Sequence, residues 1–231
     1  MKKIVIVFGL FFTMFVYSQQ SENVDDNKKH HNIGINDNDT FIILSGFVRP
    51  ITKKLGEKEI KGSKYYEEDF KLAVIYDGDK VIHKSPIKYN AFNDEIEVLE
   101  DDKEFALLKK EGIKVVLDSY QYVMLKNKGY FIIFNKNKKT SLVLKPKKKF
   151  RKGAEAESTY SQVIPPSFID NFEYYIKTKE GELEKIKLKK KNVLAVLKDK
   201  KTEIEKFASS KKLSFKKEED LVKIIEYYSS L

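Results

Sequence analysis

The sequence predicts a mainly β protein in which an antiparallel meander is followed by a small α+β part at the C-terminus. Short segments of alternating apolar and polar residues recur with turns every ~8–12 positions, a spacing typical of a β-sandwich or a partly open barrel. No helical pattern of any length interrupts them, which argues against a parallel sheet. Helical spacing of apolar residues begins only at Val193, and three short helices are expected from there on.

The organising hairpin of the meander covers residues 86–99. Ile87 and Tyr89 share one face of its first strand, and Ile96 and Val98 share one face of its second strand. The Asn and Asp residues between them tolerate turn geometry and bond to their own backbone. A slip of one residue would turn the second strand's apolar side chains to solvent, so this corner is predicted to fix the register.

The other expected strands are separated by turn residues. Asp77-Gly78-Asp79 is a strong hairpin signal because glycine accepts the positive φ of a primed turn. Residues 130–134 are apolar on both faces, so this segment is predicted to be a central strand covered on both sides. The remaining expected strands are residues 41–48, 72–76, 80–83, 103–108, 113–117, 120–125 and 141–144.

Residues 1–18 are expected to be a signal peptide. Lys2 and Lys3 precede a nearly continuous apolar run, and Ser18 ends it at a position suited to cleavage. The run is shorter than the ~20 residues of a spanning helix, so no transmembrane span is expected after cleavage, with an uncleaved anchor as the alternative. Residues 19–40 are polar and are expected to form a disordered leader. The predicted location is the periplasm or the extracellular medium.

The chain is basic and contains no cysteine. Loss of Lys2 and Lys3 with the signal peptide lowers the formal charge from +10 to +8. A high positive charge often indicates nucleic-acid binding, but export makes anionic envelope material or acidic glycans the more accessible partners, and no nucleic-acid partner is predicted. The simpler explanation is that lysine fills solvent-facing positions. Without disulfides the fold depends on its core, which a β domain over residues 41–145 is long enough to form.

Residues 146–172 are predicted to be a basic, proline-containing linker. In an exported protein such a run is either a solvated connector or a contact with an anionic surface, to which each basic residue near a charged bilayer contributes ~1 kcal/mol. The candidate contacts with an anionic surface are Lys147, Lys148, Lys149, Arg151 and Lys152.

Residues 173–231 are predicted to form a module of a hairpin and helices. The hairpin turns at Glu180-Gly181 and places Ile176 opposite Ile186 or Leu188.

The helices of this module are too short to be stable alone, so they must pack on the hairpin or on the meander. Thr202 and Glu205 fit a capping box at the start of the second helix. A helix-turn-helix reader is the alternative for these helices, and export argues against it.

The sequence carries no catalytic constellation, and a non-enzymatic protein without a cofactor is predicted. The nucleophile elbow, the phosphate loop and the zinc-binding helix motif are all missing. His30-His31 in the leader have no further ligand at a usual spacing, and His83 is expected to be partly buried in a strand, so no metal site is predicted. Glu95 and Glu97 share a strand face and are the candidates for a glycosidase pair of carboxylates, but such alternation is expected on any solvated sheet face.

Four segments resemble an uncharacterised family of exported proteins from Gram-negative bacteria. They are Gly-Ser-Lys-Tyr-Tyr-Glu-Glu-Asp-Phe at 62–70, Lys-Tyr-Asn-Ala-Phe-Asn-Asp-Glu-Ile-Glu at 88–97, Gly-Tyr-Phe at 129–131 and the ending at 218–231. The resemblance covers the chain from about Gly62 onward and implies export, with no activity to carry over. Lys64 stands where that family's pattern has proline.

Two functional classes follow from these observations. The first is an envelope protein that binds another protein or an anionic surface, and the second is a carrier of a small apolar ligand in the β domain. An enclosed cavity would favour the carrier, whereas a filled interior with exposed aromatic patches would favour the binding protein. The corner residues either fix the turn, which is favoured, or present Phe92 to a partner. These candidates are Asn90, Phe92, Asn93, Asp94 and Glu95.

Overall fold

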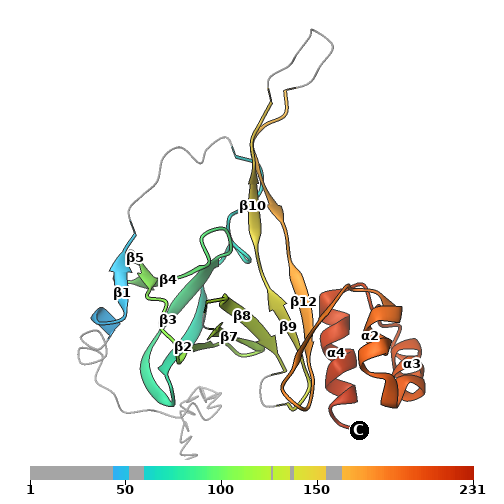
Figure 1. Cartoon of the computed structure of the whole chain (residues 1–231). Coiled ribbons are helices and arrows are strands. Elements are labelled where there is room, and N and C mark those ends of the chain that lie inside the picture. The colour runs from blue at the N-terminus through green and yellow to red at the C-terminus, as the bar shows by residue number, and fades with distance from the viewer. Residues whose placement is uncertain (1–43, 52–59, 126, 136–137, 155–162) are drawn as a thin grey trace, which may run out of the picture. The chain divides into compact units, whose positions relative to one another are not determined.

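One antiparallel sheet of eleven strands carries most of the fold (Figure 1). The computed structural model describes residues 44–51, 60–125, 127–135, 138–154 and 163–231, and all of these belong to the compact unit Ile35–Leu231. The predicted signal peptide and leader lie outside the described residues.

The strands of this sheet follow the order β1-β5-β4-β3-β2-β6-β7-β8-β9-β12-β13, and every neighbouring pair is antiparallel. The predicted antiparallel meander with C-terminal helices is therefore confirmed, as an open sheet whose edges are β1 and β13. The strands are β1 Val48–Pro50, β2 Lys71–Asp77, β3 Lys80–Asn90, β4 Glu95–Glu100, β5 Lys103–Leu107, β6 Ile113–Val116, β7 Tyr120–Leu125, β8 Gly129–Phe134, β9 Ser141–Lys145, β12 Glu173–Lys177 and β13 Leu183–Ile186.

Tyrosine contacts show that the sheet is strongly curved. Two strands lie between β3 and β7, so a flat sheet would hold β3 and β7 ~14 Å apart. The rings of Tyr89 on β3 and Tyr122 on β7 nevertheless have their centroids 5.1 Å apart. Tyr130 on β8 packs edge-on against Tyr89 at 6.2 Å, and all three side chains are at most 1% exposed. The concave side of the sheet is therefore filled by phenol rings.

The local hairpins agree with the sequence pattern. Gly78 adopts a φ of +61° in the turn between β2 and β3, the conformation for which glycine was expected there. The pairing of Tyr89 with Ile96 and of Ile87 with Val98 gives the predicted β3–β4 hairpin. β8 lies between β7 and β9 and is almost wholly buried, as its apolar composition predicts.

The expected first strand over residues 41–48 is wrong in its described part. Leu44 lies in a helical turn, with the N–H of Phe47 donating to its carbonyl at 2.7 Å, and β1 begins only at Val48. β1 is an edge strand, where Pro50 can be accommodated without a backbone N–H.

The segment expected to be a linker contains two paired strands. β10 Lys148–Arg151 and β11 Ser167–Asp170 form a separate two-stranded antiparallel sheet. The parallel bridge between Lys61 and Ser167 ties this hairpin to an earlier part of the chain. Gly62 makes that approach possible, because a Cβ there would lie 2.8 Å from the carbonyl oxygen of Phe168. The prediction of an unstructured connector fails because these contacts are long-range.

The C-terminal hairpin continues the main sheet, since β12 pairs with β9 through Tyr174 opposite Leu144. The hairpin exists as expected, but its register differs. Ile176 lies opposite Glu184, and Tyr174 lies opposite Ile186. The observed connection is shorter than expected, because the N–H of Thr178 donates to the carbonyl of Glu182 at 2.9 Å and closes the turn earlier along the chain.

Three α-helices follow, as the sequence predicts. They are α2 Lys190–Val196, α3 Lys201–Ser210 and α4 Glu218–Tyr228, with a 3₁₀ turn η2 at Lys198–Lys200. The predicted capping box is wrong, because η2 leads the chain into α3 already at Lys201 and Thr202 lies inside the helix without a side-chain cap. None of the helices in the described ranges has the length and apolar character needed to cross a bilayer.

The helices pack on the sheet and share its core. Ile204, Leu221 and Ile224 are fully buried in the same apolar cluster as the sheet side chains. Glu218, in the first turn of α4, accepts hydrogen bonds from the hydroxyls of Tyr66 and Tyr174, each at 2.8 Å. The C-terminal region is therefore not an independent module.

Candidate functional site

The β3–β4 corner is fixed by its own side chains. β3 ends at Asn90 and β4 begins at Glu95. The side-chain oxygen of Asn90 accepts a hydrogen bond from the N–H of Asn93 at 3.0 Å, as an Asx residue in a turn is expected to do. Asp94 has a φ of +58°, which Asp and Asn tolerate better than most residues. The corner therefore holds Asp94 in one orientation.

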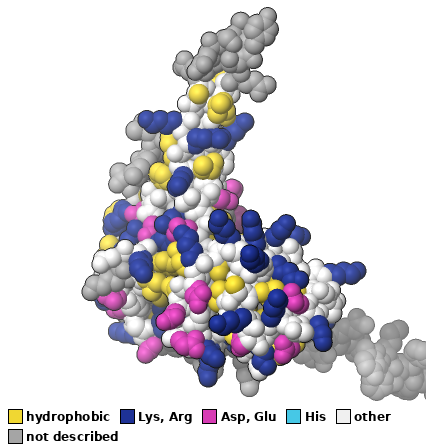
Figure 2. All heavy atoms as spheres, turned by 45° about the vertical axis from the view of Figure 1, so that its right-hand side comes forward, with side chains coloured by type: hydrophobic (Ala, Val, Ile, Leu, Met, Phe, Trp, Pro, Cys, Tyr) yellow, Lys and Arg dark blue, Asp and Glu magenta, His cyan; other side chains and the backbone are white. Residues whose placement is uncertain are grey.

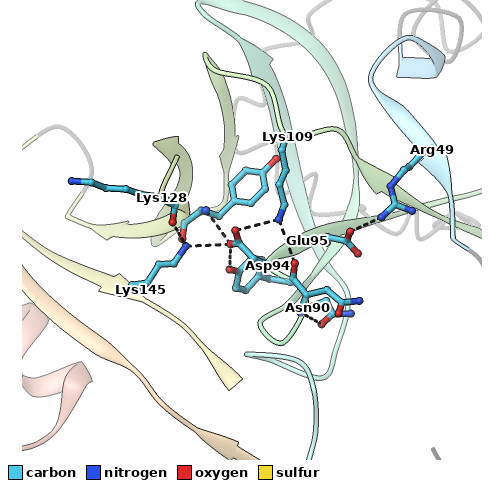
Figure 3. Close-up of polar contacts among 10 residues, drawn as sticks. Arg49, Asn90, Asp94, Glu95, Lys109, Lys128 and Lys145 are labelled. Carbon is cyan, nitrogen blue, oxygen red and sulfur yellow. Dashed lines mark hydrogen bonds and ion pairs between the residues drawn. The ribbon is translucent and has the colours of Figure 1, made fainter. Parts of the chain in front are cut away.

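Asp94 joins the corner to strands on the far side of the curved sheet (Figure 3). Its Oδ1 accepts hydrogen bonds from the hydroxyl of Tyr89 at 2.6 Å and from the N–H of Tyr130 at 3.0 Å. The Nζ atom of Lys145 lies 3.4 Å from Oδ1 of Asp94, and the Nζ atom of Lys109 lies 3.3 Å from Oδ2. One carboxylate thus connects β3, β8 and β9 with the end of β5.

Lys145 is a buried cation at the base of this cluster. Its side chain is 6% exposed, and its Nζ donates to the carbonyls of Lys128 at 2.5 Å and of Tyr130 at 3.2 Å. Burial lowers the pKa of Lys145, while Asp94 opposes that change. The ammonium group of Lys145 is therefore already bonded to protein acceptors.

Gly129 is required at the start of β8 by this arrangement. Its φ is +80°, and a Cβ would lie 1.9 Å from Oδ2 of Asp94 and 2.6 Å from Nζ of Lys145. Any larger residue would displace the carboxylate or the ammonium group.

The expectation that Glu97 faces solvent is wrong. The residue is 2% exposed, and its carboxylate accepts hydrogen bonds from the Tyr65 hydroxyl at 2.8 Å and from the Asn90 amide at 3.0 Å. Glu95 instead forms an ion pair with Arg49. Tyr65 and Arg49 come from other segments of the chain, so strand alternation alone could not indicate these contacts.

A cleft of about 630 Å³ opens beside the corner, and it brings together the two sets of residues singled out in the sequence. Phe92 and Asp94 come from the corner, and residues 147–149 come from the basic run. Six lysines and one carboxylate line it. The full lining is Ala91, Phe92, Asp94, Lys109, Met124, Asn127, Lys128, Gly129, Lys145, Lys147, Lys148, Lys149 and Asn171.

The cations of the cleft differ in how strongly protein acids already neutralise them. Lys147 lies 3.2 Å from Glu173, and Lys148 lies 2.5 Å from Asp170. Among the described residues, no ion pair involves Lys128 or Lys149, and both are exposed. The cleft therefore presents ammonium groups that an anionic ligand can bind directly.

Some predicted residues lie outside the cleft, and some cleft residues were not predicted. Arg151 and Lys152 lie farther along the hairpin, where the Nε of Arg151 donates to the hydroxyl of Ser167 at 3.1 Å. Asn90, Asn93 and Glu95 do not line the cleft. Lys109, Lys128 and Lys145 were missed, because a lysine near a strand end carries no local signal that it will meet others.

The described residues do not contain a cluster of metal-ligating side chains. Within them, no group of three or more His, Asp and Glu side chains is arranged to hold a metal ion. His83 is buried, with its Nε2 2.8 Å from Oε2 of Glu100, and it lies outside the cleft.

Comparison with known proteins gives no further guide. No family model matches the chain, and neither curated proteins nor solved structures give a match.

Proposed function

We propose that the protein is an exported, non-enzymatic envelope protein that binds an anionic surface through the lysine-lined cleft. The observation that supports this most directly is the meeting of six lysines with a single carboxylate around one opening. Phosphate and carboxylate groups are the anions that such a cleft would bind, because ammonium groups donate charge-assisted hydrogen bonds to their oxygens.

The second candidate class, a carrier of a small apolar ligand, receives less support. The space on the concave side of the sheet is taken by the buried rings of Tyr89, Tyr122 and Tyr130. In contrast, Phe92 at the cleft remains 46% exposed. A filled interior with exposed aromatic side chains is the pattern expected of a protein that binds at its surface.

The proposal predicts that cleft lysines determine binding to anionic vesicles. Replacing Lys128, Lys147 and Lys149 together by Gln should weaken binding to phosphatidylglycerol-containing vesicles by roughly a hundredfold, since each basic residue contributes ~1 kcal/mol. Co-sedimentation with vesicles measures the bound fraction, and added salt should reduce it because the attraction is screened.

A matched variant separates the cleft from the overall charge. Lys187, Lys189 and Lys191 are exposed lysines outside the cleft, and their replacement by Gln removes the same charge. This control should weaken binding much less than the cleft variant. Equal losses in the two variants would mean that general positive charge, and not the cleft, binds the surface.

The proposed export predicts which residue forms the N-terminus of the mature protein. Mass spectrometry of the protein isolated from its native cells should find an N-terminus at Gln19, in intact or cyclised form, because the signal peptide is expected to end at Ser18. Recovery of the protein from the envelope with Met1 still present would contradict cleavage.

A further inference from the structure

The β10–β11 hairpin extends beyond the main sheet as a two-stranded ribbon (Figure 1). Phe150 lies opposite Phe168 on one face, and Lys149 lies opposite Ile169 on the other face. The flanking residues Ala154 and Ile164 exchange backbone hydrogen bonds of 2.8 and 2.9 Å, which continue the pairing toward the tip. Such a ribbon has few neighbours to cover either face.

Large apolar side chains on this hairpin are exposed to solvent. Phe150 is 42% exposed, Ile169 is 41% exposed and Ile164 is 49% exposed, and Val163 reaches 67%. Because Phe150 and Ile169 point to opposite faces of the ribbon, both faces are partly apolar. Exposed apolar residues of this size, gathered on one hairpin, indicate a surface that is covered in use.

Positive charge surrounds these apolar side chains. Figure 2 shows apolar and basic side chains interspersed on the projecting hairpin. The sequence from 147 to 171 contains five basic residues and three acids, Glu155, Glu157 and Asp170. Asp170 already pairs with Lys148. The net positive charge of this segment therefore favours contact with an anionic surface.

The apolar surface is continuous with the cleft. The ring of Phe168 lies 5.8 Å from that of Phe150 and 5.2 Å from that of Phe92, measured between centroids. Phe92 and Lys149 both line the cleft. A surface that contacts the lysines of the cleft would therefore also meet the aromatic row of the hairpin.

We propose that the β10–β11 hairpin inserts into the interfacial region of an anionic lipid bilayer, with Phe150 as its principal apolar contact. This inference rests on the proposed function and names the bilayer as the anionic surface. A groove on a protein partner would cover one face of the ribbon, whereas the boundary between headgroups and acyl chains surrounds both. Lysine and arginine side chains can then extend to the headgroups while apolar neighbours are buried.

A tryptophan reporter tests insertion directly, because the chain has no tryptophan of its own. The Phe150→Trp variant should show a blue-shifted emission on vesicles of phosphatidylglycerol and phosphatidylcholine in equal parts, and no shift on phosphatidylcholine alone. The control is Leu72→Trp, at a position 58% exposed on β2. Its emission should not shift on either vesicle.

A second pair of variants measures the contribution to binding. Phe150→Ser should weaken vesicle binding roughly tenfold, because the bilayer would no longer bury an aromatic side chain, and Leu72→Ser should leave binding unchanged. Both positions are exposed, so thermal unfolding should remain near that of the unmodified protein.

The failures of the two proposals are distinguishable. If the vesicles bind the protein while the Phe150→Trp emission stays unshifted and Phe150→Ser binds normally, insertion is wrong and electrostatic binding stands. If anionic vesicles do not bind the unmodified protein at all, the bilayer is not the partner. If the unmodified protein also does not bind an anionic polysaccharide, the proposed function is wrong as well.

Discussion

Replacing Asp94 by Ala should lower the free energy of unfolding by about 3 kcal/mol, the lower end of the range for removing one partner of a buried ion pair, because Lys145 is buried but Asp94 is 27% exposed. The Lys145 ammonium group would lose its carboxylate while its side chain is 6% exposed. The Tyr89 hydroxyl and the Tyr130 N–H would lose their acceptor as well. Urea unfolding of the variant and the unmodified protein measures the difference.

Two further variants show which property of Asp94 matters. Asp94→Asn keeps the shape of the side chain and tolerates the φ of +58°, but it removes the charge. It should therefore lower the free energy of unfolding by less than Asp94→Ala does. Asp79→Ala removes an acid from another hairpin turn, where the side chain is fully exposed and 3.4 Å from Lys114. This control should leave the free energy of unfolding nearly unchanged, because solvent screens an exposed ion pair. If Asp94→Ala unfolds like Asp79→Ala, the corner does not hold the curved sheet together.

Some contacts of the β3–β4 corner could be predicted from the sequence, and others could not. The hairpin around residues 86–99 and the Asx bond from Asn90 follow from alternation and turn chemistry within a few positions. The contact between Asp94 and Lys145 spans 51 residues, and nothing in either segment indicates the other. Glu97 was therefore expected on a solvated sheet face and Lys145 was not singled out, yet both are buried.

The same limit applies to the cleft and the hairpin. Phe92 and the basic run were each recognisable as unusual, but only the curvature of the sheet and the return of β11 along β10 bring them together. The basic segment looked like a linker because its lysines hide the strand pattern of residues 148–151. Its pairing with β11 depends on residues more than fifteen positions away, beyond the range of local propensity.

Alkaline pH should unfold the protein steeply. Burial raises the pKa of Tyr89, Tyr120, Tyr122 and Tyr130 above the ordinary tyrosine value. Above pH ~10 these phenols ionise in the unfolded chain but stay protonated in the folded one, so their contribution is fully present below pH ~10 and is lost as pH rises. In that range each phenol lowers the free energy of unfolding by about 1.4 kcal/mol per pH unit, and the four together lower it by ~5–6 kcal/mol per unit.

That slope is large compared with the ~5–15 kcal/mol by which domains are stable, so unfolding should be complete within about one to three pH units above 10. Lys145 acts in the opposite direction, because its lowered pKa makes the unfolded chain bind more protons and stability rise with pH. Lys145 is one group against these four phenols, and burial also raises the pKa values of Tyr66, Tyr174 and Tyr228. The effect of Lys145 ends once the unfolded lysine has titrated near pH ~10.4. Circular dichroism and the part of the phenolate absorbance that comes from these buried tyrosines should therefore change together in one cooperative step.

The Tyr130→Phe variant isolates one of these phenols. The Tyr130 hydroxyl is buried and has no hydrogen-bond partner among the described residues, so its removal breaks no bond. The slope of stability against pH above 10 should fall by about 1.4 kcal/mol per unit, with little change at neutral pH. A difference in phenolate absorbance between the unmodified protein and Tyr130→Phe that develops before any loss of circular dichroism would show that Tyr130 ionises in the folded protein. In that case the tyrosine-filled concave side of the sheet would be open to water.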